Sequence, residues 1–239
     1  MNIALVLAGG VGQRMHQEIP KQFLHVENKP VLIYTLEAFE RHPSIDAILV
    51  VTLEGWTDIL WAYARQFGIA KLKWVVVGGE TGQQSIYNGI AKLREDDVDG
   101  DAVVMVHDGI RPLVSSDIIS GNLAVVEKYG NAITCIPCRE VMMLCEDGVS
   151  SNKLISRDKL LRTQTPQSFR LKDLWSAHEE ARRRGITNSV ASCSLMQELG
   201  RRVYFSEGSE KNVKITTPED LDIFKALLHT HADAWIRKQ

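Results

Sequence analysis

The sequence predicts an α/β fold in which a mostly parallel sheet carries helices on both faces. Within the first 136 residues, short apolar runs alternate with longer segments whose apolar residues recur at helical spacing. The first run, Ile3 to Leu7, leads directly into glycines, as a buried parallel strand leads into a tight loop. The chain has 239 residues, of which 44% are hydrophobic, and this suits a single domain over residues 1–239.

The predicted strands and helices alternate along this first part of the chain. Strands are expected at residues 3–7, 46–52, 73–77, 102–106 and 132–136, and helices at 31–42, 55–67, 85–94 and 117–128. In parallel sheets of this kind, ligands bind at the carboxyl ends of the strands. The loops that follow Leu7, Val77 and Val106 are therefore expected to meet at one rim, where a site would lie.

The alternation stops between residues 137 and 165, where we predict an arm that protrudes from the domain. Segments 139–144 and 153–155 flank Glu146-Asp147-Gly148 in the manner of a hairpin. This region has too few apolar residues for a core of its own. It is therefore expected to bury itself against a second copy of the chain, which makes the protein a homodimer.

Beyond the arm, the pattern predicts further helices and strands of the same domain. Helices are expected at 172–184, 189–199 and 218–228, and strands at 202–205 and 212–215. The last helix should open with Thr217 as its N-cap and Pro218 at its first position.

Composition limits the partners and the location of the protein. The net charge of −2 and the pI of about 6.4 give no general attraction to nucleic acid, so any phosphate site has to be local. The chain lacks a signal-like segment, and its longest apolar runs are of strand length, which predicts a cytoplasmic protein without a membrane span. Cys135 and Cys138 form a C-x-x-C pair, but a structural zinc site usually needs a second such pair, and a redox dithiol should lie at the start of a helix. Neither condition is met, so we do not expect these cysteines to serve a metal or redox function.

The first loop, Ala8-Gly9-Gly10-x-Gly12, has the composition of a phosphate-binding turn. Glycines let backbone N–H groups turn towards an anion, and Arg14 and Lys21 add two cations. A P-loop would require Gly-Lys-Ser/Thr, which is missing, and the dinucleotide fingerprint lacks its third glycine. The alternative is an ordinary connection between a strand and a helix, but such a turn does not require both cations.

The fourth predicted strand ends in Val106-His107-Asp108-Gly109-Ile110-Arg111-Pro112. Asp108 follows a buried strand on the expected rim, where a carboxylate could hold Mg²⁺. The alternative is a turn residue, because Asp-Gly is a common turn pair. For His107 we favour packing or hydrogen bonding over metal binding, and Arg111 could either contact an acceptor phosphate or pin the loop.

Four motifs occur in order along the chain. The first is L-A-G-G-x-G-x-R-M at 7–15, followed by P-K-Q at 20–22. The others are V-H-D-x-x-R-P at 106–112, T-P-Q-x-F within 162–169, and N-V-K-I-T-T-P-E-D-L at 212–221. Together they resemble the nucleotidyltransferases, and most closely the 2-C-methyl-D-erythritol 4-phosphate and ribitol-5-phosphate cytidylyltransferases. The resemblance extends from Ile3 to about Leu228.

The resemblance implies a Rossmann-like nucleotidyltransferase fold with a dimerisation arm, and a site for CTP, Mg²⁺ and a polyol phosphate. The implied catalytic cations are Arg14, Lys21 and Lys214. The implied nucleotide-binding positions are Leu7, Ala8, Gly9, Gly10, Gly12, Gly79, Glu80 and Ser85. The implied metal ligand is Asp108, and the implied acceptor-binding residues are Asp108, Arg111, Arg139, Arg157 and Thr165, with Arg157 reaching the neighbouring subunit.

Several positions depart from the family pattern. Gly82 replaces a customary arginine of the cytosine-recognition loop, and Val141 replaces a threonine of the methylerythritol branch. Asn188 and Lys211 replace carboxylates, with Glu210 as the nearby substitute for the second. These changes favour transfer of CMP to ribitol 5-phosphate or a related alditol phosphate used in surface polysaccharide. The alternatives are methylerythritol 4-phosphate as acceptor, another nucleoside triphosphate as donor, and a non-catalytic nucleotide sensor.

Overall fold

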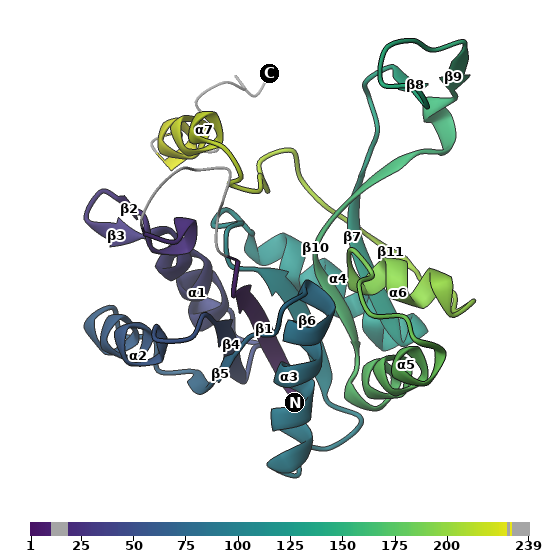
Figure 1. Ribbon diagram of the computed structural model, residues 1–239. Coiled ribbons are helices and arrows are strands. Elements are labelled where there is room, and N and C mark those ends of the chain that lie inside the picture. The colour runs from purple at the N-terminus through teal and green to yellow at the C-terminus, as the bar shows by residue number, and fades with distance from the viewer. Residues whose placement is uncertain (11–18, 229, 231–239) are drawn as a thin grey trace, which may run out of the picture.

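A seven-stranded sheet forms the centre of the part of the chain that the computed structural model describes, residues 1–10, 19–228 and 230. Its strand order is β11-β7-β10-β6-β1-β4-β5 (Figure 1). The strands are β1 (Asn2–Ala8), β4 (Ala47–Thr52), β5 (Leu72–Val77), β6 (Val103–Asp108), β7 (Asn131–Pro137), β10 (Leu161–Arg170) and β11 (Phe205–Glu207). All run parallel except β10, which is antiparallel to both of its neighbours, so the predicted mostly parallel sheet is confirmed.

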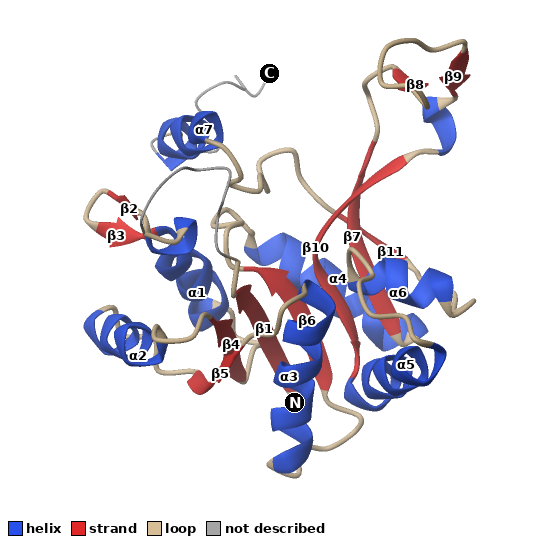
Figure 2. Ribbon diagram, in the orientation of Figure 1, coloured by secondary structure: helices blue, strands red, loops and turns tan. Residues whose placement is uncertain are grey.

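Helices cover both faces of this sheet (Figure 2). One face carries α3 (Gly82–Glu95), α5 (Leu171–Arg184) and α6 (Ser192–Glu198), and the other carries α1 (Val31–Arg41), α2 (Thr57–Gln66) and α4 (Ser116–Tyr129). Along β1, Ile3 and Leu5 point into the first core, whereas Ala4 and Val6 point into the second. Both faces of β1 are therefore buried, which explains its continuous apolar sequence. None of the described helices is long and apolar enough to cross a bilayer.

The second half of the chain departs from the predicted elements at β10. Sequence reasoning treated this segment only as a motif, because it is mostly polar and contains Pro166, which cannot donate to a strand ladder. The structure accommodates the proline with a register shift between Thr163 and Gln167 on the β7 side. The predicted strand at 202–205 is displaced to β11, and the strand predicted at 212–215 is wrong, because Asn212 and Ile215 are buried in an irregular segment.

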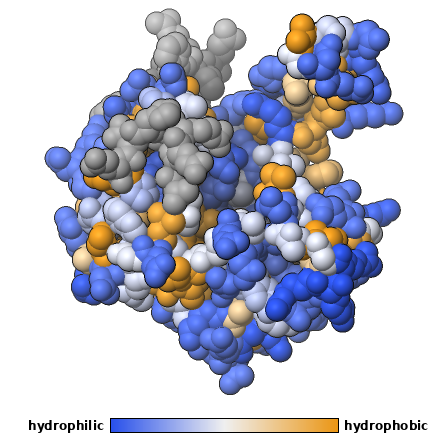
Figure 3. Space-filling model, viewed as in Figure 1, coloured by the Kyte–Doolittle hydropathy of each residue, from blue (hydrophilic) through white to orange (hydrophobic). Residues whose placement is uncertain are grey.

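The predicted arm extends from β7 and β10 and projects from the body of the molecule (Figure 1). It consists of β8 (Met142–Leu144), β9 (Lys153–Ile155) and the short helix η3 (Arg157–Lys159), and β8 pairs with β9 in antiparallel fashion. Apolar residues lie exposed on the arm (Figure 3). The most exposed of these are Val141, Met143, Val149 and Leu154. No residue of β8, β9 or η3 belongs to the two central cores.

The last described helix, α7 (Pro218–Leu228), is fixed at its first turn by a reciprocal cap. The hydroxyl of Thr217 accepts a hydrogen bond from the Asp220 backbone N–H at 3.4 Å, and Asp220 Oδ2 accepts from the backbone N–H groups of Thr216 and Thr217 at 2.8 and 2.9 Å. Farther along, Phe224 is fully buried and packs edge-on against Tyr34 of α1. The predicted N-cap is therefore confirmed, and α7 anchors the irregular segment that precedes it.

Replacing Asp220 with alanine should lower the free energy of unfolding by about 1 kcal/mol, because the half of the cap that the Asp220 carboxylate forms with Thr216 and Thr217 is lost. Burial alone would raise the pKa of Asp220, but its bonds from Thr216 and Thr217 outweigh burial and hold the pKa below the ordinary carboxyl value. A group with a depressed folded-state pKa stabilises the fold above its ordinary pKa and loses this effect as the pH falls. Urea unfolding should therefore show a constant difference from wild type between about pH 8 and 5. A difference that vanished at neutral pH would contradict the cap.

Candidate active site

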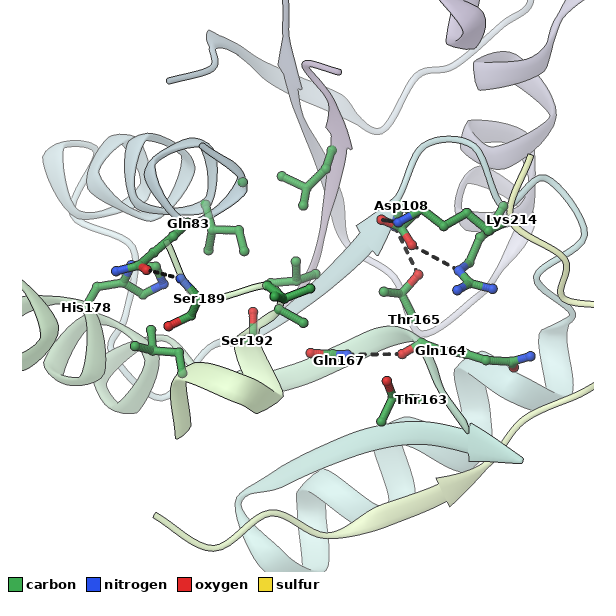
Figure 4. Close-up of a pocket in the computed structure, with 18 residues that line it drawn as sticks. Gln83, Asp108, Thr163, Gln164, Thr165, Gln167, His178, Ser189, Ser192 and Lys214 are labelled. Carbon is green, nitrogen blue, oxygen red and sulfur yellow. Dashed lines mark hydrogen bonds and ion pairs between the residues drawn. The ribbon is translucent and has the colours of Figure 1, made fainter. Parts of the chain in front are cut away.

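Two adjoining cavities open where β1 and β6 end. The first, which we call the loop cavity, is lined by Ala8, Gly9 and Gly10 of the glycine loop and by the start of α3. The second, the inner cavity, lies between α3, α6 and β10 (Figure 4). Four residues line both cavities, namely Leu7, Gly82, Asp108 and Lys214. Two ligands bound in these cavities would therefore meet at Asp108 and Lys214.

The far wall of the loop cavity is the turn that connects β5 to α3. The hydroxyl of Ser85 accepts a hydrogen bond from the Gly79 backbone N–H at 3.1 Å, and Thr81 caps α3 by accepting from the Gln84 N–H at 3.1 Å. A side chain at Gly79 would not fit, because its Cβ would lie 2.1 Å from Gln84 Cγ. The amino end of α3 thus opens towards the cavity, where its backbone dipoles favour an anion.

The near wall of the loop cavity contains Lys21, which begins the short helix η2 (Lys21–Phe23). The two residues that follow Lys21 in η2, Gln22 and Phe23, fix this helix to the body of the protein. The buried Gln22 side chain donates from Nε2 to the carbonyl oxygen of Ala8 at 2.6 Å, and Phe23 stacks on Trp56 with ring centroids 4.2 Å apart. Between η2 and α1 lies a small hairpin of β2 (His25–Val26) and β3 (Lys29–Pro30).

Asp108 ends β6 and holds two cations from different parts of the chain. Its Oδ2 accepts from Arg111 Nε at 3.0 Å, and its Oδ1 accepts from Lys214 Nζ at 3.1 Å. Burial alone would raise the pKa of Asp108, but Lys214 and Arg111 hold this pKa below the ordinary value. Asp108 is therefore a carboxylate at neutral pH. The glycine that follows it serves close packing, because a Cβ on Gly109 would lie 2.9 Å from the carbonyl oxygen of Leu7.

Lys214 reaches Asp108 because the segment before α7 is tied to two neighbouring elements. The backbone N–H of Ile215 donates to the carbonyl oxygen of Ile110 at 2.9 Å, and Arg111 Nη1 donates to the carbonyl oxygen of Asn212 at 2.6 Å. The buried Asn212 side chain donates in turn to the carbonyl oxygen of Thr165 at 2.9 Å. The Arg111 side chain therefore fixes the loop that follows β6 and joins this loop to the segment that carries Lys214.

Apolar side chains and a few buried polar atoms line the deep end of the inner cavity. Ile86, Val106 and Leu195 supply its apolar wall. His178 Nε2 and Ser192 Oγ are buried there without a hydrogen-bond partner among the described residues. Burial lowers the pKa of His178 to about 4, so this imidazole is neutral at physiological pH. Sequence reasoning missed both residues, because each lies within an amphipathic helix and in no motif.

The structure brings most of the predicted site residues to these two cavities. The loop cavity collects Leu7, Ala8, Gly9, Gly10, Lys21, Gly79, Glu80 and Ser85, and the inner cavity collects Asp108, Arg111, Thr165 and Lys214. Gly12 and Arg14 lie outside the described residues. Arg139 and Arg157 lie on or beside the projecting arm, where Arg157 Nη1 donates to the carbonyl oxygen of Arg139 at 2.9 Å. Within one chain, neither of these arginines lines either cavity.

The donor set around Asp108 suits Mg²⁺ better than a metal that needs an all-protein cage. Among the described residues, no group of three or more histidines, cysteines, aspartates or glutamates could hold a metal ion. Mg²⁺ commonly binds through one or two carboxylates, substrate phosphates and water, and Asp108 beside the loop cavity could supply the carboxylate of such a site. Glu210, the candidate second carboxylate, instead pairs with Arg162 and lines neither cavity.

The chain is similar to known proteins over nearly its whole length. The family model for 2-C-methyl-D-erythritol 4-phosphate cytidylyltransferase matches residues 2–230. The chain is 46% identical to the ribitol-5-phosphate cytidylyltransferase of Lacticaseibacillus paracasei, over 95% of this chain and 98% of the relative. It is 35% identical to the 2-C-methyl-D-erythritol 4-phosphate cytidylyltransferase of Clostridium botulinum, over 95% and 97%. A solved 2-C-methyl-D-erythritol 4-phosphate cytidylyltransferase from Francisella tularensis is 28% identical, with a TM-score of 0.78 over 94% of this chain and 98% of that one.

Proposed function

The chain belongs to the 2-C-methyl-D-erythritol 4-phosphate cytidylyltransferase family and is a cytidylyltransferase, and we propose that its acceptor is ribitol 5-phosphate or a closely related alditol phosphate. CMP would pass from CTP to the phosphate of this acceptor and leave a CDP-alcohol and pyrophosphate. The observation that carries the proposal is the pair of cavities that share Asp108 and Lys214. Similarity favours ribitol 5-phosphate over methylerythritol 4-phosphate, because the relative named for the former has the higher identity.

The reaction needs no covalent intermediate, because the acceptor already carries an anionic nucleophile. An oxygen of the acceptor phosphate forms a bond to the α-phosphorus of CTP, while the bond from that phosphorus to the bridging oxygen breaks. Pyrophosphate leaves with the electron pair of the broken bond. The protein contributes alignment of the two ligands and neutralisation of their charge, which we assign to Lys21, Lys214 and the amides of the glycine loop.

Asp108 is the residue that we propose as the ligand for Mg²⁺. The bound ion would neutralise phosphate charge at the point where the two cavities meet. Its binding would compete with Lys214 for Asp108 Oδ1, because this oxygen now accepts from Lys214 Nζ at 3.1 Å. The Lys214 side chain is about two-fifths exposed and can turn towards the substrates without uncovering a core.

Gly82 bears on the choice of nucleotide. A Cβ at this position would meet no atom within 4 Å, and its φ is not in the left-handed region, so neither packing nor backbone strain requires a glycine. The missing side chain leaves space where the loop cavity joins the inner cavity. We propose CTP as the donor, and comparison of CTP with UTP and ATP tests this choice.

Because these nucleotides are cytoplasmic metabolites, we also infer that the enzyme works in the cytoplasm.

The acceptor site becomes complete in a homodimer under this proposal. Arg139 and Arg157 carry the charge that a second phosphate ligand requires, but they lie on or beside the arm. An arm that crosses to a second copy would bring them to that copy's inner cavity. Val141, which replaces the threonine of the methylerythritol branch, is exposed beside them and would present a methyl group there.

The first prediction concerns the acceptor. Wild-type enzyme with CTP and Mg²⁺ should release pyrophosphate fastest with ribitol 5-phosphate or another alditol phosphate, compared as kcat/KM against methylerythritol 4-phosphate. A polar group that has lost its hydroxyl partner at Val141 costs roughly 1–3 kcal/mol, or about 5- to 150-fold in kcat/KM. Methylerythritol 4-phosphate winning by about tenfold or more would reverse the assignment. No turnover with any acceptor would instead support the nucleotide sensor.

The second prediction concerns Lys21. Replacing Lys21 with alanine should lower kcat by about 10²–10³, because a preorganised cation near the α-phosphate stabilises charge that grows in the transition state. The KM for CTP should change much less. Lys73→Ala removes an exposed lysine of β5 that lines neither cavity, and it serves as the control. An unchanged kcat with only a raised KM for CTP would remove Lys21 from the chemical step.

The third prediction concerns the metal ligand. Asp108→Asn should abolish Mg²⁺-dependent turnover with little loss of secondary structure by circular dichroism, because the amide keeps the shape and removes the charge. Glu210→Gln is the matched control, since Glu210 pairs with Arg162 away from both cavities and should leave the Mg²⁺ dependence unchanged. Full activity of Asp108→Asn at ordinary Mg²⁺ concentrations would show that Asp108 is a turn residue and not the metal ligand.

The fourth prediction concerns assembly. An exposed apolar arm is expected to be covered in a homodimer, so light scattering at micromolar concentration should give twice the chain mass. The double variant Met143→Glu with Leu154→Glu should be monomeric and weakly active, because charges would be buried at the interface. Ile59→Glu alters an exposed apolar residue of α2, away from the arm, and should stay dimeric. An active wild-type monomer would refute the shared site.

A further inference from the structure

His107 is completely buried at the end of β6, and both of its ring nitrogens have partners. Nε2 lies 3.2 Å from the carbonyl oxygen of Arg111, and Nδ1 lies 3.1 Å from the hydroxyl oxygen of Thr165. The ring also packs edge-on against Phe39, with centroids 5.1 Å apart. The imidazole therefore connects β6, the loop after it and β10, in agreement with the packing or hydrogen-bonding role that the sequence suggested.

These partners determine where the protons lie. A carbonyl oxygen can only accept a hydrogen bond, so Nε2 of His107 carries a proton. The ring is completely buried and its two nitrogens face a carbonyl oxygen and a hydroxyl, not a carboxylate, so it is neutral, and a neutral imidazole with a proton on Nε2 has a lone pair on Nδ1. The Thr165 hydroxyl therefore donates its proton to Nδ1.

The same hydroxyl has a second fixed partner. The backbone N–H of Asp108 donates to Thr165 Oγ1 at 3.0 Å and uses one of its two lone pairs. One lone pair is left, and Thr165 lines the inner cavity (Figure 4). At this point the protein can accept a hydrogen bond from a ligand hydroxyl, but it cannot donate one to a phosphate oxygen.

We propose that His107 is a positioning residue that fixes the Thr165 hydroxyl as a hydrogen-bond acceptor and so assigns this point of the inner cavity to a hydroxyl group of the polyol. This inference rests on the proposed function, in which the acceptor occupies the inner cavity. The phosphate of the acceptor is then directed to the cations of Arg111 and Lys214, which also line the cavity. Orientation of the acceptor follows from one buried ring that does not itself touch it.

Two substitutions at His107 separate its two hydrogen bonds. The amide of asparagine occupies the place of Nδ1, so His107→Asn can keep the bond to Thr165 and loses the bond to Arg111. The amide of glutamine reaches the place of Nε2, so His107→Gln keeps the bond to Arg111 and frees the Thr165 hydroxyl. With ribitol 5-phosphate and CTP, His107→Gln should raise the KM for the acceptor by about 5- to 30-fold, while kcat and the KM for CTP change less than about twofold. His107→Asn should stay within about threefold of wild type.

A second measurement tests whether the effect passes through Thr165. Thr165→Val removes the hydroxyl and keeps the shape, and it should raise the KM for the acceptor by as much as His107→Gln does. In the Thr165→Val background, His107→Gln should then add no further increase, because no hydroxyl is left to position. Thr165→Ser keeps the hydroxyl, so His107→Gln should again raise the acceptor KM in that background.

His42 provides the control for simple loss of a buried histidine. It is also buried, its Nε2 lies 2.9 Å from Ser120 Oγ, and it lines neither cavity. His42→Gln should lower stability to urea without changing the KM for the acceptor. Equal KM increases for His107→Asn and His107→Gln, or additive effects of His107→Gln and Thr165→Val, would overturn the proposal.

A wrong choice of acceptor would give a different result from a wrong role for His107. Wild-type enzyme would then turn over methylerythritol 4-phosphate in place of ribitol 5-phosphate, and the same variant series run with that acceptor still tests His107. Both acceptors carry hydroxyl groups, so the predicted order of the variants is the same. A KM for either accepted substrate that is insensitive to His107→Gln would count against the positioning role.

Discussion

The Asp108 carboxylate, held between the cations of Arg111 and Lys214, is the interaction on which the rest of the site depends. A largely buried charge is stable only when it is paired, and here its partners come from the adjoining loop and from a segment 106 residues away. Arg111 also binds the carbonyl oxygen of Asn212, so the same arginine fixes both the carboxylate and the approach of Lys214. Removing a partner would therefore disturb more than one contact.

The ion pairs of Asp108 lie where the loop cavity and the inner cavity meet. The amino end of α3 and the glycine loop make one cavity suited to a polyanion, and β10 with α6 makes the other. The strand β10 is antiparallel to both of its neighbours and contributes Thr165, whose hydroxyl receives the Asp108 backbone N–H. The position of β10 in the sheet brings the Thr165 hydroxyl, which lines the inner cavity, within hydrogen-bond distance of the residue that ends β6.

The first half of the fold could be predicted because β1 and β4 are apolar on both faces and α1 between them has apolar residues at helical spacing. Asp108 was predicted from its place after such a strand. The strand β10 could not be recognised from its polar sequence, and the buried His178 belongs to no motif. Periodicity could not bring Lys214 to Asp108 either, since that contact depends on tertiary hydrogen bonds at Asn212 and Ile215. Lys214 was identified as a site residue only because the motif at 212–221 resembles that of the family.

The central claim is that CMP passes directly between ligands that meet at Asp108 and Lys214. A single-turnover experiment tests it, with enzyme in excess over CTP, with Mg²⁺, and with or without ribitol 5-phosphate or whichever acceptor the enzyme uses. Direct transfer predicts pyrophosphate equal to the bound CTP when the acceptor is present and none on the same timescale when it is absent. A burst of pyrophosphate without acceptor, accompanied by CMP attached to the protein, would contradict direct transfer.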